Sequence, residues 1–273
     1  MKQEITNIEI QLLLEGIYRI YGYDFRNYSL ASLKRRIKKR MNAERVNTIS
    51  GLQEKVFHQP ETMQNLFFDL SINVTEFFRN PPFYKMFRKK VLPVLKTYPF
   101  ARIWHAGCST GEEVYSMAIL LKEEGVYDRC KIYATDMNEM VTKKAKQGIF
   151  KLESMKKHTQ NYIHAGGTEE FSKYYTAHYQ NAIFNSSLKK NVVFAQHNLV
   201  TDSSFNEFNV ILCMNVMIYF NKTLQEKVIG LLDKSLCNFG LLCVGEKESL
   251  NYTSFNNKYT PLDDHQKIYQ KMK

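Results

Sequence analysis

Two glycines and a later acid are the first residues in this sequence whose types and spacing could do chemistry. Gly107 comes directly after the mostly apolar run 103–106, and Gly111 follows four residues later. Asp136 comes directly after a second such run, 132–135. Glycines let a backbone approach a ligand closely, and an acid roughly 20–30 residues further on can accept hydrogen bonds from both hydroxyls of a ribose. The pattern predicts a nucleoside-binding turn; the alternative is that the glycines serve packing alone.

The elements around these residues predict a parallel sheet. One buried helix face is indicated by apolar residues at i, i+3, i+4 and i+7, which are Val114, Met117, Ala118 and Leu121. A strand, a glycine turn, a helix and a second strand form a βαβ unit, whose ligand crevice lies beyond the carboxyl ends of its strands. The spacing matches neither GxGxxG nor GxxxxGKS/T, the phosphate-binding patterns. A nucleoside without a long polyphosphate therefore fits better, and S-adenosylmethionine is the commonest such ligand on this scaffold.

The composition indicates an ordinary globular protein of the cytoplasm. The chain has 273 residues, no apolar run long enough to span a bilayer, and Glu4, Glu9 and Glu15 where a signal peptide would be apolar. Its five cysteines lack CxxC spacing, and its seven histidines are dispersed without ligand spacing. The cysteines are therefore interpreted as reduced core residues, and no metal site is expected.

The net charge predicts an acidic partner. Lysine and arginine number 38 against 27 aspartates and glutamates, which gives a formal charge of +11. Such a charge suits a nucleic acid, an anionic membrane surface or an acidic protein face, and charge alone does not choose between them.

Residues 1–72 predict a small all-helical domain with a basic second helix. Leu33, Ile37 and Met41 form the apolar stripe of that helix, and cations cover the rest of its circumference. Because like charges one turn apart repel and no acid is interleaved, a surface that docks an acidic partner is favoured over a merely solvated face. Few aromatic residues accompany the cations, which argues against single-stranded nucleic acid. The candidate docking residues are Lys34, Arg35, Arg36, Lys38 and Lys39.

The segment after this domain interleaves polar residues with two adjacent phenylalanines. The two phenylalanines are Phe77 and Phe78. The polar residues near them in the sequence are Asn73, Thr75 and Arg79. A linker would not need two adjacent phenylalanines. The segment is therefore predicted to lie across the mouth of the glycine-turn crevice with Arg79 pointing in; a helix-capping turn with a surface arginine is the alternative.

Residues 73–273 predict one α/β domain with an insert. The region 158–190 breaks the alternation of strands and helices and predicts short antiparallel strands, which either recognise a partner or are decorative. Strands then resume and end at the polar residues Asn198 and Asn215, where an open sheet places its ligands. The helix that follows is predicted to stop near Gly240, and an antiparallel hairpin is expected at the edge of the sheet.

Five segments in the same order resemble the CheR family, the chemoreceptor glutamate O-methyltransferases. They read NVTEFFRNP, GCSTGEEVYS, ATDMN, HNL and CMNVMIYFNK, and the earlier stretch YGYDFRNYSLASLKRRIKKRM resembles that family's basic first domain. The resemblance covers nearly the whole chain. It implies a Rossmann-like S-adenosylmethionine-dependent methyltransferase domain in the α/β class, an inserted small antiparallel β-subdomain that touches the receptor, and a small all-α N-terminal domain.

The resemblance also implies roles for particular residues. Arg79 and Tyr219 would orient the reacting groups, and Glu113, more than Glu112, would bind the amino acid end of the cofactor. The cofactor-binding residues that the resemblance implies are Asn73, Thr75, Arg79, Gly107, Glu112, Glu113, Asp136, Met137, Asn198, Leu199, Asn215 and Val216.

Two places depart from the family pattern. Met214 stands where the family usually has arginine, and residues 245–248 read Gly-Glu-Lys-Glu where the family reads Gly-His-Ser-Glu. The cofactor residues are retained, so cofactor binding is expected to be intact, whereas contacts with the substrate could differ.

The implied reaction moves a methyl group from S-adenosylmethionine to glutamate side chains of chemoreceptors and leaves S-adenosylhomocysteine. A glutamate with a pKa of about 4.3 is already ionised at neutral pH, so no general base is required. Alignment of the reacting groups can supply about 7–11 kcal/mol.

The partner implied by the resemblance is the acidic cytoplasmic helical region of a chemoreceptor, docked on the basic helix of a monomeric enzyme. One alternative is a methyltransferase that acts on another acidic protein or on nucleic acid. The other is a signalling module that binds S-adenosylmethionine without turnover.

Overall fold

The computed structural model describes residues 2–273, with side chains from Glu4 onward. The chain divides into two compact units. The first comprises the chain up to Ile72 together with Tyr219–Val228, and the second comprises Asn73–Ile218 together with Ile229–Lys273.

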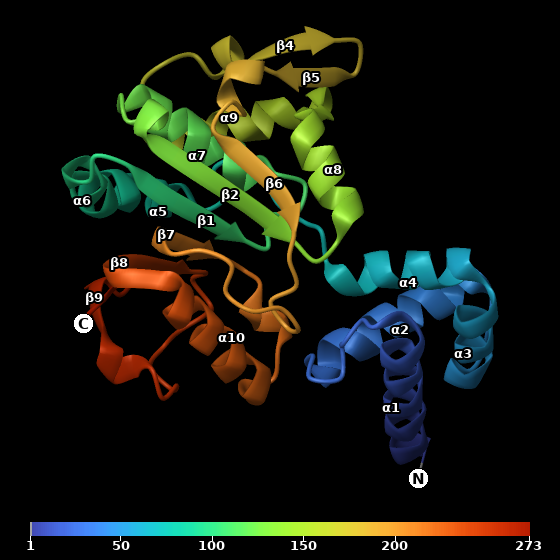
Figure 1. Cartoon of the computed structure of the whole chain (residues 1–273). Helices are drawn as coiled ribbons and strands as arrows, with labels where there is room; N and C mark the ends of the chain where they lie inside the picture. Colours follow the sequence, from blue (N-terminus) through green and yellow to red (C-terminus); the bar gives the residue numbers. More distant parts are fainter. Residues whose placement is uncertain (1) are drawn as a thin grey trace. The chain divides into compact units, whose positions relative to one another are not determined.

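The first unit is helical, with α1 (Lys2–Tyr21), α2 (Leu30–Glu44), α3 (Ile49–His58) and α4 (Pro60–Ser71) (Figure 1). α1 packs against α3, and both α2 and α3 pack against α4. Thr48 caps α3 by accepting a hydrogen bond of 3.0 Å from Gly51 N, and Pro60 occupies the first turn of α4, where its missing N–H is not needed. Leu33 and Ile37 of the predicted α2 stripe are buried, as their spacing indicated.

The main sheet of the second unit contains β1 (Ala101–Ala106), β2 (Cys130–Asp136), β6 (Val192–Gln196), β7 (Phe208–Cys213), β8 (Leu236–Val244), β9 (Tyr259–Asp263) and β10 (Ile268–Lys271). Their order across the sheet is β6-β2-β1-β7-β8-β10-β9. The pairs from β6 to β8 are parallel, whereas β10 is antiparallel to β8, and β9 is antiparallel to β10. The predicted parallel sheet with an antiparallel hairpin at its edge is confirmed.

Helices connect these strands (Figure 1). α7 (Glu112–Glu123) joins β1 to β2, α8 (Glu139–Gln147) follows β2, and α10 (Lys222–Ser235) joins β7 to β8. α10 ends at Ser235 and not near Gly240 as predicted, because Leu236 already pairs with Phe208 of β7. Short turns of 3-10 helix are η2 (Tyr127–Arg129), η3 (Leu152–Ser154), η4 (Phe171–Tyr174), η5 (Ser186–Leu188), η6 (Met217–Tyr219) and η7 (Asn256–Lys258).

Three consecutive helical pieces precede β1: α5 (Pro81–Met86), the π-helical η1 (Phe87–Val91) and α6 (Leu92–Thr97). Leu92 N donates to Phe87 O across the wider turn. Pro93 comes next and has no N–H to continue an α-helical ladder, so the π turn lies where that ladder is interrupted. Among the described helices of the chain, none is long and apolar enough to cross a membrane.

A small antiparallel sheet with the order β3-β5-β4 is inserted between β2 and β6. β4 (Tyr175–His178) and β5 (Asn181–Phe184) confirm the antiparallel strands predicted within 158–190. The third strand, β3 (Ile149–Lys151), lies before the predicted start, and α9 (Met155–His164) is helical where strands were expected. A strand this short shows too little alternation to be predicted from its own residues.

Phe77 joins this small sheet to the rest of the second unit. Its side chain is fully buried, stacks on Phe184 of β5 with 4.6 Å between ring centroids, and meets Phe150 of β3 edge-on at 4.8 Å. One aromatic cluster is therefore shared by the segment before β1 and by the inserted sheet.

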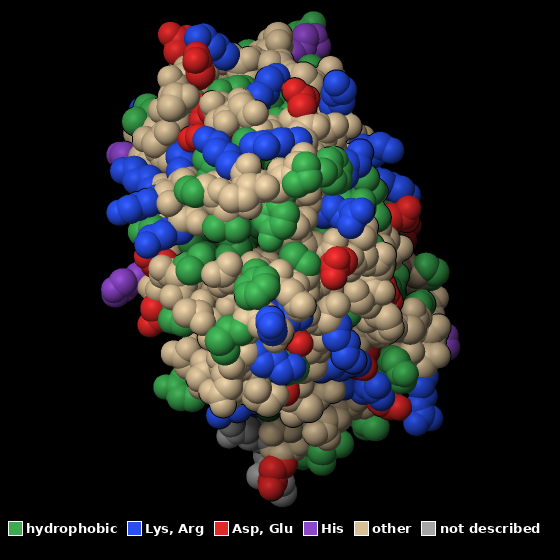
Figure 2. Space-filling model, turned by 60° about the vertical axis from the view of Figure 1, so that its left-hand side comes forward, with side chains coloured by type: hydrophobic (Ala, Val, Ile, Leu, Met, Phe, Trp, Pro, Cys, Tyr) green, Lys and Arg blue, Asp and Glu red, His purple; other side chains and the backbone are tan. Residues whose placement is uncertain are grey.

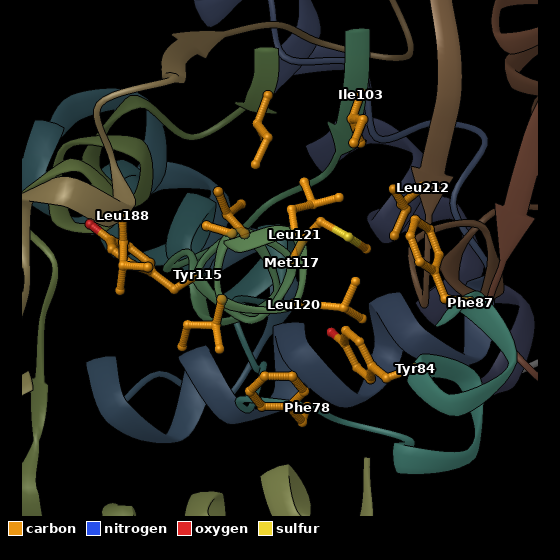
Figure 3. Close-up of a cluster of buried hydrophobic side chains, with 14 of the residues drawn as sticks. Phe78, Tyr84, Phe87, Ile103, Tyr115, Met117, Leu120, Leu121, Leu188 and Leu212 are labelled. Carbon is orange, nitrogen blue, oxygen red and sulfur yellow. The ribbon is translucent and has the colours of Figure 1, made fainter. Parts of the chain in front are cut away.

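α7 is buried on all sides. The sequence predicted one apolar face for it, yet Tyr115 and Leu120, which lie outside that face, are at most 1% exposed. Figure 3 shows side chains from β1, β7 and α5 around this helix, among them Ile103, Leu212 and Tyr84. A helix that is apolar all round belongs in a protein interior, and its first turn is therefore a rigid support for the side chains it carries.

We expect Phe77→Ala to lower the free energy of unfolding of the second unit by about 3–5 kcal/mol, because it leaves a cavity inside the shared aromatic cluster. Urea unfolding followed by circular dichroism measures this change. Phe100→Ala is the matched control, since Phe100 is 50% exposed, and it should cost about 0.5 kcal/mol or less. Equal losses in the two variants would contradict the role given to Phe77.

Candidate functional site

The loops that follow β6, β2, β1 and β7 lie at one edge of the main sheet. These four strands are consecutive neighbours and run parallel, so their carboxyl ends point the same way. The loops carry most of the predicted cofactor residues, namely Gly107 after β1, Asp136 and Met137 at the end of β2, Asn198 and Leu199 after β6, and Asn215 and Val216 after β7.

Asp136 is a buried carboxylate whose two oxygens both accept hydrogen bonds from backbone N–H groups. Ser109 N donates to Oδ2 and Asn138 N donates to Oδ1, both at 3.0 Å. Burial raises the pKa of Asp136 to about 6, although the backbone donors act in the opposite direction. Each oxygen retains lone pairs for further hydrogen bonds. The carboxylate can therefore accept the two hydroxyls of a ribose while the protein holds it in place.

The glycine turn has a conformation and a packing that both require glycine. Gly107 and Gly111 have φ angles of +90° and +97°. A Cβ at Gly107 would lie 2.6 Å from Val216 Cγ2, and one at Gly111 would lie 2.8 Å from Ala145 Cβ. Packing, which was the alternative interpretation of these glycines, is thus part of their role.

Ser109, in the middle of this turn, makes the site suitable for a polar ligand. It is 8% exposed and has a φ of 51°, which is uncommon for a residue with a side chain. Its hydroxyl is buried and has no hydrogen-bond partner among the described residues. A buried hydroxyl beside a carboxylate with open lone pairs fits a nucleoside better than an apolar ligand. The sequence pattern indicated the turn but did not single out Ser109.

Two glutamates begin α7, where the N-terminal end of a helix favours negative charge. Glu113 Oε1 lies 2.8 Å from His105 Nδ1 of β1, and Glu112 Oε2 accepts a hydrogen bond of 2.6 Å from the Thr110 hydroxyl. Burial raises the pKa of Glu112 to about 7, and the nearby Glu76 carboxylate adds to the shift. The structure does not test which glutamate binds the cofactor, so that assignment stays a prediction. His105, fully buried in an apolar strand, was not predicted as a site residue.

The segment with the paired phenylalanines is anchored to α7. Phe77 and Phe78 are fully buried, and Phe78 N donates to Ser116 Oγ of α7 at 2.9 Å. Arg79 is exposed, and its Nη1 donates to Val74 O at 3.2 Å within the same segment. The buried rings fix the segment and leave the Arg79 side chain at the surface, and its predicted orientation toward the crevice stays a prediction. The roles of Asn73, Thr75 and Arg79 stay predictions.

The loop after β6 is shaped by its own asparagine. Asn198 Oδ1 accepts from Val200 N at 3.0 Å, and Asn198 N donates to Asp202 Oδ2 at 2.8 Å. The side chain of Leu199, the next residue in the chain, is buried. The contacts of Asn198 and Leu199 with a cofactor stay predictions.

Glu248 is a buried acid at this edge that the sequence did not single out. It is 5% exposed, and its carboxylate accepts hydrogen bonds from the backbone N–H groups of Asn215, Ile218 and Gly245. Residues 245–248 were noted only as a departure from the family pattern. The family's Gly-His-Ser-Glu nevertheless ends in glutamate, and that retained residue was the signal that could have identified Glu248.

Tyr219 belongs to the first unit. Its carbonyl oxygen accepts from Ser29 N at 2.7 Å, and the guanidinium carbon of Arg36 lies 5.6 Å from the centre of its ring. The next residue, Phe220, forms an isolated antiparallel β-bridge with Tyr28. The orienting role expected of Tyr219 stays a prediction.

Part of the basic face of α2 is occupied by contacts inside the first unit. Asp69 of α4 is 8% exposed; it binds Lys39 Nζ at 2.8 Å and the Arg40 guanidinium at 2.5 Å, and its carbonyl oxygen accepts from Arg36 Nη1 at 2.7 Å. The acid that α2 itself lacks is thus supplied by α4. Lys34, Arg35 and Lys38 make no ion pair with the described residues, and so the docking prediction now depends mainly on them.

Cations are also numerous elsewhere. Figure 2 shows lysine and arginine side chains spread over the face in view, as the formal charge of +11 indicates. In the part of the chain that the structure describes, no group of three or more histidine, cysteine, aspartate or glutamate residues could hold a metal ion.

A glycine turn and a buried acid at the carboxyl edge of a parallel sheet are typical of the Rossmann-like, S-adenosylmethionine-dependent methyltransferases. Within that class, the chain belongs to the CheR methyltransferase family. A family model described as "CheR methyltransferase, SAM binding domain" matches residues 73–267, and a second, "CheR methyltransferase, all-alpha domain", matches residues 8–71. The resemblance of the sequence segments to this family is confirmed, and S-adenosylmethionine is the cofactor.

Relatives with similar sequences support the same family. "Putative methyltransferase Cher3" of Pseudomonas putida is 50% identical over 266 residues, which cover 97% of each chain. A "Chemotaxis protein methyltransferase" of Listeria monocytogenes is 27% identical over 236 residues, covering 86% of this chain and 87% of that protein. An uncharacterized 104.1 kDa protein of Rhodobacter capsulatus is 27% identical over 258 residues, which cover 92% of this chain and 26% of that longer protein.

The affinity for S-adenosylhomocysteine should fall as the pH drops below about 6, the pKa of Asp136, by about tenfold per pH unit. The reason is that a protonated carboxyl group no longer offers two acceptor oxygens to the ribose. Calorimetric titration between about pH 5 and about pH 8 measures this dependence.

Two variants identify the titrating group. Asp136→Asn should bind more weakly at neutral pH and lose the step near pH 6, whereas Glu112→Gln, which removes a second carboxylate with a raised pKa, should keep that step. An affinity of the unmodified protein that stays constant down to about pH 5 would show that Asp136 does not bind the ribose as an anion.

Proposed function

We propose that this protein transfers a methyl group from S-adenosylmethionine to glutamate side chains of chemoreceptors, which gives glutamate methyl esters and S-adenosylhomocysteine. The observation that carries the proposal is the buried Asp136 carboxylate beside the glycine turn in a chain of the CheR family. A relative named "Chemotaxis protein methyltransferase" matches most of this chain and supports a receptor as the substrate.

The acids of the second unit suit a cofactor that carries positive charge. S-adenosylmethionine supplies a methyl group on a positively charged sulfur. Asp136 would bind its ribose, and Glu112 or Glu113 would bind its ammonium group. Asn73, Thr75, Asn215 and Val216 would enclose the remainder, as the family pattern implies. Because the protein already holds these carboxylates in place, they do not have to rearrange when the cofactor binds. Orienting the cofactor therefore costs little further free energy.

The reaction needs alignment more than proton transfer. A substrate glutamate with a pKa of about 4.3 is ionised at neutral pH and is itself the nucleophile, so no base among the described residues has to be invoked. The protein's contribution is to bring the carboxylate into line with the methyl group and to remove part of its hydration, effects that can supply about 7–11 kcal/mol. Arg79 and Tyr219 are proposed to orient the glutamate.

The first unit is proposed to dock the acidic helical region of a receptor. Lys34, Arg35 and Lys38 of α2 make no ion pair with the described residues and carry like charge on one helix. Lys39 is 74% exposed although it contacts Asp69, so it can contribute, whereas Arg36 is held by the Asp69 carbonyl and the Tyr219 ring. Binding through exposed cations would be sensitive to salt. The enzyme is proposed to act as a monomer in the cytoplasm.

Labelled S-adenosylmethionine and receptor-containing membranes from the same cell test the proposal. A carboxyl methyl ester releases labelled methanol in mild base, whereas a methylated base or amine does not. We expect base-labile label on a membrane protein. Base-stable label would indicate another substrate class, and tight S-adenosylhomocysteine binding without any transfer would indicate a signalling module.

Replacing Lys34, Arg35 and Lys38 together with glutamine should raise the KM for the receptor roughly tenfold, since each charge at the helix surface contributes a fraction of a kcal/mol to docking. The affinity for S-adenosylhomocysteine should not change. Lys89→Gln combined with Lys90→Gln is the matched control, because both lysines are exposed on a different helical segment. If the KM of the triple variant equals that of the control, the basic face of α2 is only solvated.

A further inference from the structure

Glu248 is a buried carboxylate to which the proposed chemistry gives no task. It lies after β8, the neighbour of β7 in the main sheet, and is 5% exposed. Burial of a charged group is unfavourable unless donors compensate for the lost water. The hydrogen-bond donors around the Glu248 carboxylate therefore indicate the role of this residue.

The donors come from one loop and one turn. Oε2 accepts from Asn215 N at 3.0 Å and from Gly245 N at 2.5 Å, and Oε1 accepts from Ile218 N at 3.1 Å. Glu248 N in turn donates to Gly245 O at 2.8 Å. A Cβ at Gly245 would lie 2.6 Å from Glu248 Oε2, so only glycine leaves room for the carboxylate here. Glu248 thus closes the loop that follows β7 onto the loop that follows β8.

The loop after β7 has a conformation that needs such support. Asn215 has a φ of 61°, in the left-handed region that residues with a side chain rarely adopt. Residues in that region persist where the surroundings over-determine them. The N–H groups of Asn215 and Ile218 both point at the Glu248 carboxylate, a concave arrangement of amides that favours an anion. The anion and the loop conformation therefore stabilise each other.

The same loop contacts the glycine turn after β1. Val216 Cγ2 would lie 2.6 Å from a Cβ at Gly107, and β1 and β7 are paired neighbours in the sheet. A shift of Asn215 or Val216 would consequently change the packing against Gly107. The path from Glu248 to the cofactor turn runs through direct contacts only.

We propose that Glu248 is a positioning residue, an internal anion that holds the loop 214–218 in its cofactor-binding form before the cofactor arrives. It does not contact the reacting atoms. The inference rests on the cofactor part of the proposed function, because the loop matters only if Asn215 and Val216 bind S-adenosylmethionine. It does not depend on which substrate receives the methyl group.

The test compares Glu248→Gln with Glu246→Gln. Glutamine has nearly the shape of glutamate, but its amide group would turn a donor toward backbone donors that now face an oxygen. Glu246 lies two residues away, is exposed, and undergoes the same chemical change without touching the loop. Calorimetric titration of the full chain with S-adenosylhomocysteine gives the dissociation constant and the number of sites separately.

For Glu248→Gln we expect a dissociation constant weakened by about tenfold or more with close to one site per chain, and for Glu246→Gln no change in either. A purely structural role would lower the number of competent sites and leave the dissociation constant of the remaining molecules unchanged. That result, or a dissociation constant equal to that of the control, would overturn the proposal.

Hydrogen exchange on the unmodified protein keeps the proposal testable if Glu248→Gln does not fold. The amides of Asn215 and Ile218 should be protected without any cofactor, in contrast to the amide of the exposed Tyr252. Rapid exchange of both amides in the unliganded protein would overturn the proposal. Neither measurement requires methyl transfer. A failure of the receptor assay would therefore not decide whether this inference is right.

Discussion

Backbone amides that bind buried carboxylates are the interaction on which this sheet edge depends. Asp136 is bound by Ser109 N and Asn138 N, and Glu248 by the amides of the neighbouring loop. In both cases burial raises the pKa of the acid, and the backbone donors act against that shift. The loops need acceptors for their N–H groups, and the acids need donors, so each specifies the other. A site built in this way is ordered before a ligand reaches it.

A third buried acid fixes the inserted sheet to the same core. Glu123, at the end of α7, has a side chain that is 1% exposed and accepts hydrogen bonds from the hydroxyls of Tyr162 and Tyr174. The Arg88 guanidinium, from the helical segment before β1, completes the cluster. Together with the aromatic cluster around Phe77, these contacts make the small sheet a fixed part of the second unit. α7 thus carries the two glutamates predicted to bind the cofactor at its beginning and contacts the insert at its end.

Sequence patterns predicted the parts of this fold that repeat at a regular spacing. The parallel strands, the glycine turn and Asp136 were predicted because strand, turn, helix and acid follow one another in the order that a βαβ unit requires. The contacts of α2 were not predicted, since the acid that binds its cations is Asp69, some thirty residues away on another helix. β3 was missed because it is three residues long. Glu248 was missed because its role depends on loops that meet only in the folded sheet.

The central claim is that an ordered carboxylate, Asp136, receives the ribose of the cofactor at the carboxyl edge of the sheet. A crystal structure of the protein with S-adenosylhomocysteine tests it most directly. We expect both ribose hydroxyls within hydrogen-bond distance of Asp136, with the backbone of Gly107–Gly111 and of the loop 214–218 unchanged from that described above. A nucleoside bound elsewhere, or an Asp136 side chain turned away from it, would contradict the account.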